Sequence, residues 1–175
     1  MGDYVRRVIV GVDGSMGSLQ ALRHAVTEAR AHDAAVCAVL AWTPPGGDGA
    51  DRRGPHANLR KVWKTVAEQR LRLAWDEALG GVPDDLPISL VTVRGRAGKA
   101  LVELADSDDD LLVVGSGSRG RLRRLVTRSV GRYCLARARC QVLAVPASGL
   151  TRQMEHGLLP RALRQRMLTR ELLAR

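Results

Sequence analysis

The chain of 175 residues suits one folded domain followed by a tail, because about 150 residues already bury a substantial core. Hydrophobic residues make up 45% of the sequence but aromatic residues only 3%, so the core must consist of Val, Leu and Ala, which suits buried parallel strands. The formal net charge of +10, carried almost entirely by arginine, favours anionic partners, although a solvated arginine-rich surface would have the same composition. No apolar run is long enough to cross a membrane and the N-terminus lacks the apolar region of a signal peptide, so we expect a cytoplasmic protein.

The first half of the chain predicts alternating strands and helices. Residues 7–12 form a β-branched run that ends at Asp13-Gly14-Ser15, which indicates a buried strand and a turn. Apolar residues then recur at helical spacing from Leu19 to Ala29, and Ser15 or Ser18 can cap this helix. A strand over 35–42, a flexible loop over 43–57 and a long helix over 59–79 are predicted next.

The second half continues the alternation. The predicted strands are 88–93, 111–115 and 141–145, and the predicted helices are 97–105 and 129–138. In the last of these helices we expect Tyr133 and Leu135 on the packed side.

Strands that alternate with helices imply right-handed βαβ units, hence a parallel sheet covered on both faces. We therefore predict an α/β domain over residues 1–147 with a Rossmann-like, five-stranded parallel sheet, which is doubly wound if its strand order is 3-2-1-4-5. A basic, helical tail is predicted over residues 148–175. In such sheets ligands bind where the strand order reverses, outside the carboxyl ends of the strands. That crevice lies between the first and fourth strands, so we expect Asp13 and Gly115 to face it.

The fourth strand runs directly into a glycine-rich turn, Gly115-Ser-Gly-Ser-Arg-Gly120. Glycines let the backbone approach a phosphate, and the following helix, predicted to begin near Ser129, offers unpaired N–H groups. The turn also matches the dinucleotide motif G-x-G-x-x-G, which requires an acidic residue about 20 residues further on. No Asp or Glu occurs between Asp110 and Glu155, so a dehydrogenase-type site is disfavoured.

Several segments together resemble the universal stress protein family, in the family's order and over roughly residues 5–147. They are Val10-Gly-Val-Asp13-Gly-Ser15 with Ser18, Val113-Val-Gly115-Ser, Arg128-Ser129-Val130 and Cys140-Gln-Val-Leu-Ala-Val-Pro146. The resemblance implies a doubly wound five-stranded sheet, commonly a homodimer, and an ATP site in one subset of members. The other subset binds no nucleotide.

In ATP-binding members the loop after the fourth strand follows G-x-x-G-x(9)-G-[ST], and the glycines hold ribose and phosphates. By position this motif falls on Gly115, Ser118, Arg128 and Ser129, so two of its three glycines are absent. A start at Gly117 recovers a second glycine but leaves the loop to Ser129 two residues short. A non-glycine in left-handed geometry costs roughly 1 kcal/mol, although the Arg128 guanidinium could itself contact a phosphate.

We therefore predict weak binding of ATP, with magnesium if it binds, in this crevice. The predicted contact residues are Asp13, Val39, Gly115, Ser118, Arg128, Ser129 and Val130.

Other motifs indicate no catalytic or metal site. Gly95-Arg-Ala-Gly98-Lys99 lacks the spacing and the hydroxyl of a P-loop, and the acidic run 106–110 lacks the glycine and Glu of a calcium loop. His24 and Glu28 are interpreted as a surface pair, because no third metal ligand is apparent. No histidine is paired with a nucleophile in a known motif, so we expect no enzyme. The three cysteines are expected to be reduced and buried.

Two association surfaces are predicted. The apolar last strand, Gln141–Val145, is expected to join a homodimer, because nothing in the sequence covers that edge. In the tail, Leu159, Leu163 and Met167 lie at helical spacing among arginines, which predicts weak polyanion binding; packing on its own dimer and fraying are the alternatives.

Two functional hypotheses follow. The first is a universal stress protein-like stress-response regulator that acts as a nucleotide (ATP) sensor or a protein-binding module. The second is an arginine-rich anion-binding module that binds no nucleotide and recognises nucleic acid, an acidic partner or a membrane surface.

Overall fold

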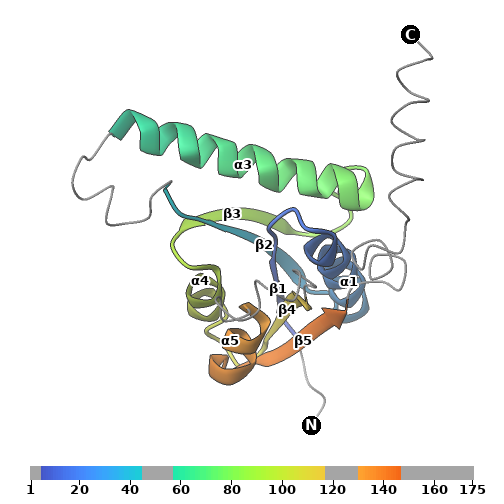
Figure 1. Ribbon diagram of the computed structural model, residues 1–175. Coiled ribbons are helices and arrows are strands. Elements are labelled where there is room, and N and C mark those ends of the chain that lie inside the picture. The colour runs from blue at the N-terminus through green and yellow to red at the C-terminus, as the bar shows by residue number, and fades with distance from the viewer. Residues whose placement is uncertain (1–4, 45–56, 117–129, 147–175) are drawn as a thin grey trace, which may run out of the picture.

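The computed structural model describes residues 5–44, 57–116 and 130–146. Within these ranges five parallel strands form one sheet of order β3-β2-β1-β4-β5, with helices on both of its faces (Figure 1). The strands are β1 (Arg7–Gly11), β2 (Ala35–Trp42), β3 (Ile88–Arg94), β4 (Asp110–Ser116) and β5 (Gln141–Pro146). The helices are α1 (Met16–His32), α3 (Ala57–Leu79), α4 (Ala97–Leu104) and α5 (Val130–Arg137). The predicted doubly wound fold and its strand order are confirmed, whereas the tail helix and the boundary at residue 147 lie outside the described residues.

The central strands are apolar on both faces because each face carries helices. Val8, Ile9 and Val10 of β1 are fully buried. One hydrophobic core lies between the sheet and the pair α1 and α3, and a second lies between the sheet and the pair α4 and α5. No helix in the described ranges is both long and apolar enough to span a bilayer.

Helix α3 packs through three alanines together with Leu71 and Trp75. Its buried residues are Ala67, Leu71, Ala74, Trp75 and Ala78. By contrast, Val62, Val66 and Leu73, which helped to indicate this helix in the sequence, are about half exposed. Alanine lets a helix approach a sheet closely, so the packed face of α3 is the stripe that combines alanine with Trp75.

Helix α5 corrects a smaller expectation. Leu135 was expected on the packed side but is 58% exposed. The buried residues of this short helix are Gly131 and Cys134. Tyr133 is half-buried and its ring lies against Gly98 of α4, where a β-carbon would come within 2.9 Å of it. The close α4–α5 packing therefore depends on a glycine opposite an aromatic ring.

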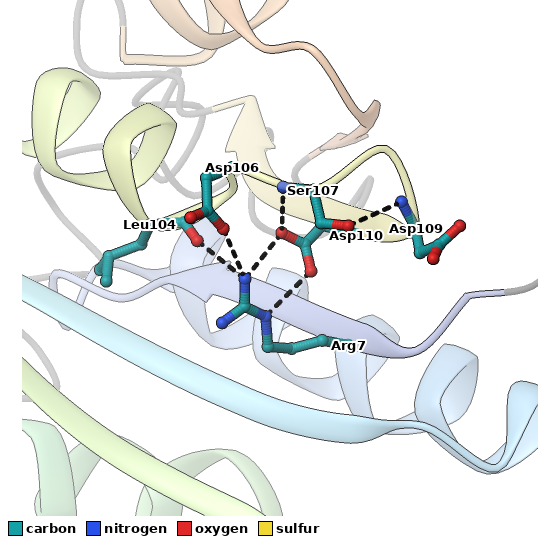
Figure 2. Close-up of polar contacts among 6 residues, drawn as sticks. All are labelled: Arg7, Leu104, Asp106, Ser107, Asp109 and Asp110. Carbon is teal, nitrogen blue, oxygen red and sulfur yellow. Dashed lines mark hydrogen bonds and ion pairs between the residues drawn. The ribbon is translucent and has the colours of Figure 1, made fainter.

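A buried ion pair joins β1 to β4 at the amino ends of the strands (Figure 2). The Arg7 guanidinium donates to both carboxylate oxygens of Asp110, each at 2.9 Å, and also to Asp106 and to the Leu104 carbonyl. Asp110 is 2% exposed and accepts a further bond from the Ser107 backbone N–H. Hydrogen bonding to Asp110 raises the pKa of Arg7. The acidic run 106–110 thus ends in Asp110, the buried partner of Arg7. The other three acids of the run, Asp106, Asp108 and Asp109, are exposed to solvent.

The three cysteines are free, as expected. Cys134 is fully buried, and burial raises the pKa of its thiol to about 11. Cys37 and Cys140 are half-buried, and burial raises their pKa values as well. Protonated, enclosed thiols are poor nucleophiles, which agrees with a packing role.

Candidate functional site

The turn between β1 and α1 brings Asp13 to the carboxyl edge of the sheet. The Val12 N–H donates to the Val39 carbonyl at 2.8 Å, which extends the β1–β2 pairing by one residue. The chain then turns through Gly14, whose φ of 76° favours glycine. The Asp13 carboxylate accepts from the Ser15 N–H at 3.0 Å, so the turn itself orients this side chain.

Two serines fix the start of α1. Ser15 is the N-cap, and its hydroxyl accepts from the Ser18 N–H at 3.3 Å. The buried Ser18 hydroxyl donates to the Ser15 carbonyl at 2.9 Å and accepts from the Asp13 N–H at 3.2 Å. The sequence left open which serine caps the helix; Ser15 is the cap, and Ser18 ties the helix back to Asp13.

Gly115 lies against the start of α1. A β-carbon at this position would be 2.5 Å from the Gly17 carbonyl oxygen and 3.1 Å from the Ser18 nitrogen. Both contacts are to backbone, which cannot move aside as a side chain can. Gly115 is therefore required for the approach of β4 to α1, whether or not a ligand binds beside it.

The structure brings Asp13 and Gly115 to one edge, as predicted, because β1 and β4 are neighbouring parallel strands. Val39 contributes its backbone carbonyl, while its side chain is 1% exposed and lies in the core. Val130 begins α5 and packs partly buried against the same core. The remaining predicted contacts, Ser118, Arg128 and Ser129, lie outside the described residues.

Arg70 of α3 is a neighbour of the crevice that sequence reasoning missed. Its guanidinium donates to the Asp13 carbonyl at 3.2 Å across 57 positions of the chain. No local motif marks this residue, because the contact exists only once α3 packs over the sheet. The contact places a cation at the β1–α1 turn.

Charge is distributed unevenly between the two edges of the sheet. The exposed cations placed by topology toward the carboxyl edge are Lys61, Lys64, Arg70, Arg94, Arg96, Lys99 and Arg132. Acids concentrate at the amino edge, where the chain returns to β3 and β4; they include Asp84, Asp85, Asp106, Asp108 and Asp109. At the carboxyl edge Lys64 and Lys99 contact Glu68 and Glu103 at 3.7 and 3.5 Å, but such exposed pairs bind weakly. An anion is therefore favoured at the edge that carries the crevice.

The other sequence motifs have structural roles in the described residues. His32, and not His24, contacts Glu28, with Nδ1 2.9 Å from the Glu28 carbonyl and 3.9 Å from its carboxylate. Gly95, in the segment with partial P-loop similarity, has a φ of 143° and forms the turn into α4. Among the described residues no group of three His, Cys, Asp or Glu side chains could hold a metal.

Comparison with known protein families agrees with the fold described above. The model of the universal stress protein family matches residues 5–146, which span every strand and helix described above. The chain belongs to the universal stress protein family.

Relatives of this universal stress protein occur in archaea and bacteria. Universal stress protein MJ0531 of Methanocaldococcus jannaschii is 27% identical over 80% of this chain and 81% of its own length. Universal stress protein Rv2005c of Mycobacterium tuberculosis is 31% identical over 81% of this chain and 45% of its own length. The chain thus spans about half the length of the mycobacterial relatives that it matches.

Solved structures of the family share the fold. A universal stress protein in complex with cAMP is 31% identical, with a TM-score of 0.52, over 83% of this chain and 99% of its own. The structure of the hypothetical protein MJ0577 has a TM-score of 0.64 at 15% identity, over 83% of this chain and 99% of its own. At 15% identity the similarity to MJ0577 concerns the fold alone. The protein that is more similar in sequence was solved with the nucleotide cAMP.

Proposed function

We propose that this universal stress protein is a cytoplasmic stress-response regulator that binds an adenine nucleotide weakly and without turnover. The observation that carries the proposal is the position of the Asp13 turn, which follows β1 beside the carboxyl end of the neighbouring strand β4 and has the Arg70 guanidinium on its carbonyl. In open parallel sheets this switch point is where ligands bind. The relative solved with cAMP, at 31% identity, supports a nucleotide as the ligand class.

The electrostatics of the crevice favour the phosphates of such a ligand. Arg70 contacts the turn that carries Asp13, and Arg132 lies in the first turn of α5. Helix α5 also directs its positive dipole end toward this edge. Against this, the family's phosphate loop has Ser118 and Arg128 where ATP-binding members have glycine. Glycine at these positions lets the backbone approach the phosphates in ATP-binding members, so we propose that binding is weak in this chain.

Titration calorimetry with ATP and magnesium, and separately with cAMP, tests the proposal. We expect measurable but weak affinity for at least one of these nucleotides. No heat change with either would refute nucleotide binding, and submicromolar affinity for ATP would show that the missing glycines matter little. Arg128→Gly then separates the two roles of that side chain: tighter binding means obstruction, and weaker binding means a phosphate contact.

The second candidate function is anion binding without a mononucleotide. The excess of cations at the carboxyl edge favours it, because that edge would attract any phosphate-bearing partner. Two measurements on the purified protein distinguish the two candidate functions. They are the ratio of absorbance at 260 nm to that at 280 nm, and mass spectrometry of the released ligand. A co-purified nucleotide supports the first function, and a nucleic acid supports the second.

We further propose that the protein is a homodimer joined through β5. Within the described residues β5 pairs on one side only, with β4. Its residues Val142 and Leu143 are half-buried and Ala144 is exposed, so an apolar edge is available for pairing.

A further inference from the structure

Cations at the carboxyl edge extend well beyond the crevice. Arg70 contacts the turn at Asp13, and Lys61 lies nine residues earlier on the same helix. At 1.5 Å per residue this separation is about 14 Å along α3. Lys61 and Lys64 therefore lie on a part of α3 away from the turn that positions Asp13.

The end of β3 and the start of α4 add to these cations. Arg94 and Arg96 are exposed where β3 passes into α4, and Lys99 is exposed in the first turn of α4. Figure 1 shows the start of α3, the end of β3 and α4 on the same side of the molecule, away from β5. We call the residues Lys61, Lys64, Arg94, Arg96 and Lys99 the α3–α4 basic edge.

Two tryptophans accompany the α3–α4 basic edge. Trp42 ends β2, is in register with Arg94 and accepts a backbone bond from the Gly95 N–H at 2.9 Å. Trp63 lies between Lys61 and Lys64 on α3. Both indoles are half-buried, whereas the third tryptophan, Trp75, is fully buried. Although only 3% of the residues are aromatic, two partly exposed indoles thus lie among the cations of this edge, and that of Trp42 also packs against the core between the sheet, α1 and α3.

This combination is the chemistry that binds single-stranded nucleic acid. Cations follow a phosphodiester backbone, and aromatic faces stack on unpaired bases without regard to their sequence. A mononucleotide in the crevice would not need cations about 14 Å away along α3, whereas a chain with one phosphate per nucleotide can contact them. An acidic protein partner would use the cations but would leave the indoles without a role.

We propose that the α3–α4 basic edge binds single-stranded nucleic acid, with Trp42 and Trp63 stacking on bases. The proposal is independent of mononucleotide binding in the crevice. The sequence of the tail is also basic, so each variant below keeps the full chain and its tail unchanged.

The test is fluorescence anisotropy of the full-length protein with a labelled oligothymidylate of about 20 nucleotides, over a salt series. For single strands each neutralised phosphate contributes about −0.7 to the slope of log affinity against log salt. The variant Lys61→Ala/Arg96→Ala should therefore reduce the steepness of this slope by about 1.4. The matched control is Arg72→Ala/Arg139→Ala, which removes the same charge from exposed positions outside the edge and should leave the slope unchanged.

Tryptophan emission provides a second readout that electrostatic attraction alone does not change. Oligothymidylate should quench the fluorescence, and Trp63→Leu should remove part of the quenching and weaken binding by about fivefold or more. Equal slopes for the edge and control variants would refute the basic edge as the site. Binding without any quenching would refute stacking, and absence of binding at low salt would refute the proposal as a whole.

Discussion

Gly115 is the predicted site residue whose role the structure changes most. In the sequence it is the first glycine of a phosphate-binding motif, and in the structure its missing β-carbon leaves room for the α1 backbone. Packing alone is enough to require glycine here. Its presence in a chain that lacks two of the other motif glycines is therefore no evidence for nucleotide binding.

Gly115→Ala is expected to destabilise the protein by about 1–3 kcal/mol, because the new methyl group would overlap the Gly17 backbone. Urea unfolding followed by circular dichroism measures the change. Gly11→Ala is the matched control: there the added carbon meets Cδ1 of Leu101 at 2.8 Å, the far end of a flexible side chain that can shift, so a smaller loss is expected. Equal losses at the two positions would contradict the role assigned to the α1 backbone.

The ion pair between Arg7 and Asp110 provides a second prediction about single residues. Asp110→Ala should lower the free energy of unfolding by about 2–3 kcal/mol, because it removes two charge-assisted hydrogen bonds at a buried carboxylate. Asp106→Ala serves as the control, since Asp106 bonds the same guanidinium but is 75% exposed. We expect it to cost less than about 1 kcal/mol. A similar cost for both variants in urea unfolding would show that burial of Asp110 is unimportant.

Among the elements, β5 carries the prediction that concerns assembly. Val142→Lys should convert a dimer into a monomer, because it places a charge in the apolar edge strand that we propose as the interface. Light scattering at micromolar protein concentration measures the mass. Val142 also packs partly against the core, so circular dichroism must show that the variant is folded.

The control for this variant lies on the opposite edge of the sheet. Leu90→Lys changes an exposed residue of β3, the other edge strand, and should leave the mass of the dimer unchanged. A monomeric wild-type protein, or a Val142→Lys variant that remains dimeric, would refute the β5 interface.

Most of the elements could be predicted from the sequence because their signals are local. The β-branched run at β1 and the apolar run at β4 indicate strands, and Gly80 follows the last residue of α3. The sequence predicted the packed face of α1, whose apolar residues from Leu19 to Ala29 are buried, but not those of α3 and α5. In α3 the alanines around Trp75 are buried while larger aliphatic residues are exposed, because the face is selected by contact with the sheet and not by residue size.

For the whole molecule, net charge is less informative than its location. A surplus of ten positive charges predicts anionic partners but no site for them. The fold directs many exposed cations toward the carboxyl edge and many acids toward the amino edge, because each connection returns the chain to one edge or the other. The carboxyl edge is therefore the side of the described domain whose charge most favours an anion.

Deletion of residues 150–175 tests the basic tail that the sequence predicts. The deletion should weaken binding to duplex DNA or to anionic vesicles and should make the remaining binding less dependent on salt, because fewer phosphates are neutralised. Fluorescence anisotropy measures binding to duplex DNA, and co-sedimentation measures binding to the vesicles. Unchanged affinity would exclude the tail, and the edge variant described above then shows whether the domain accounts for the binding.

The sequence alone predicted the strands and helices from local patterns, and the family motifs then predicted the doubly wound sheet. Its strand order puts Asp13 and Gly115 at the same edge of the sheet, because parallel topology fixes which strand ends are neighbours. Only the tertiary structure assigned Arg70 to the Asp13 turn, Asp110 to Arg7, and Gly115 to the α1 backbone. All three contacts join residues 57 to 103 positions apart, and no local pattern encodes which groups meet when separate elements pack.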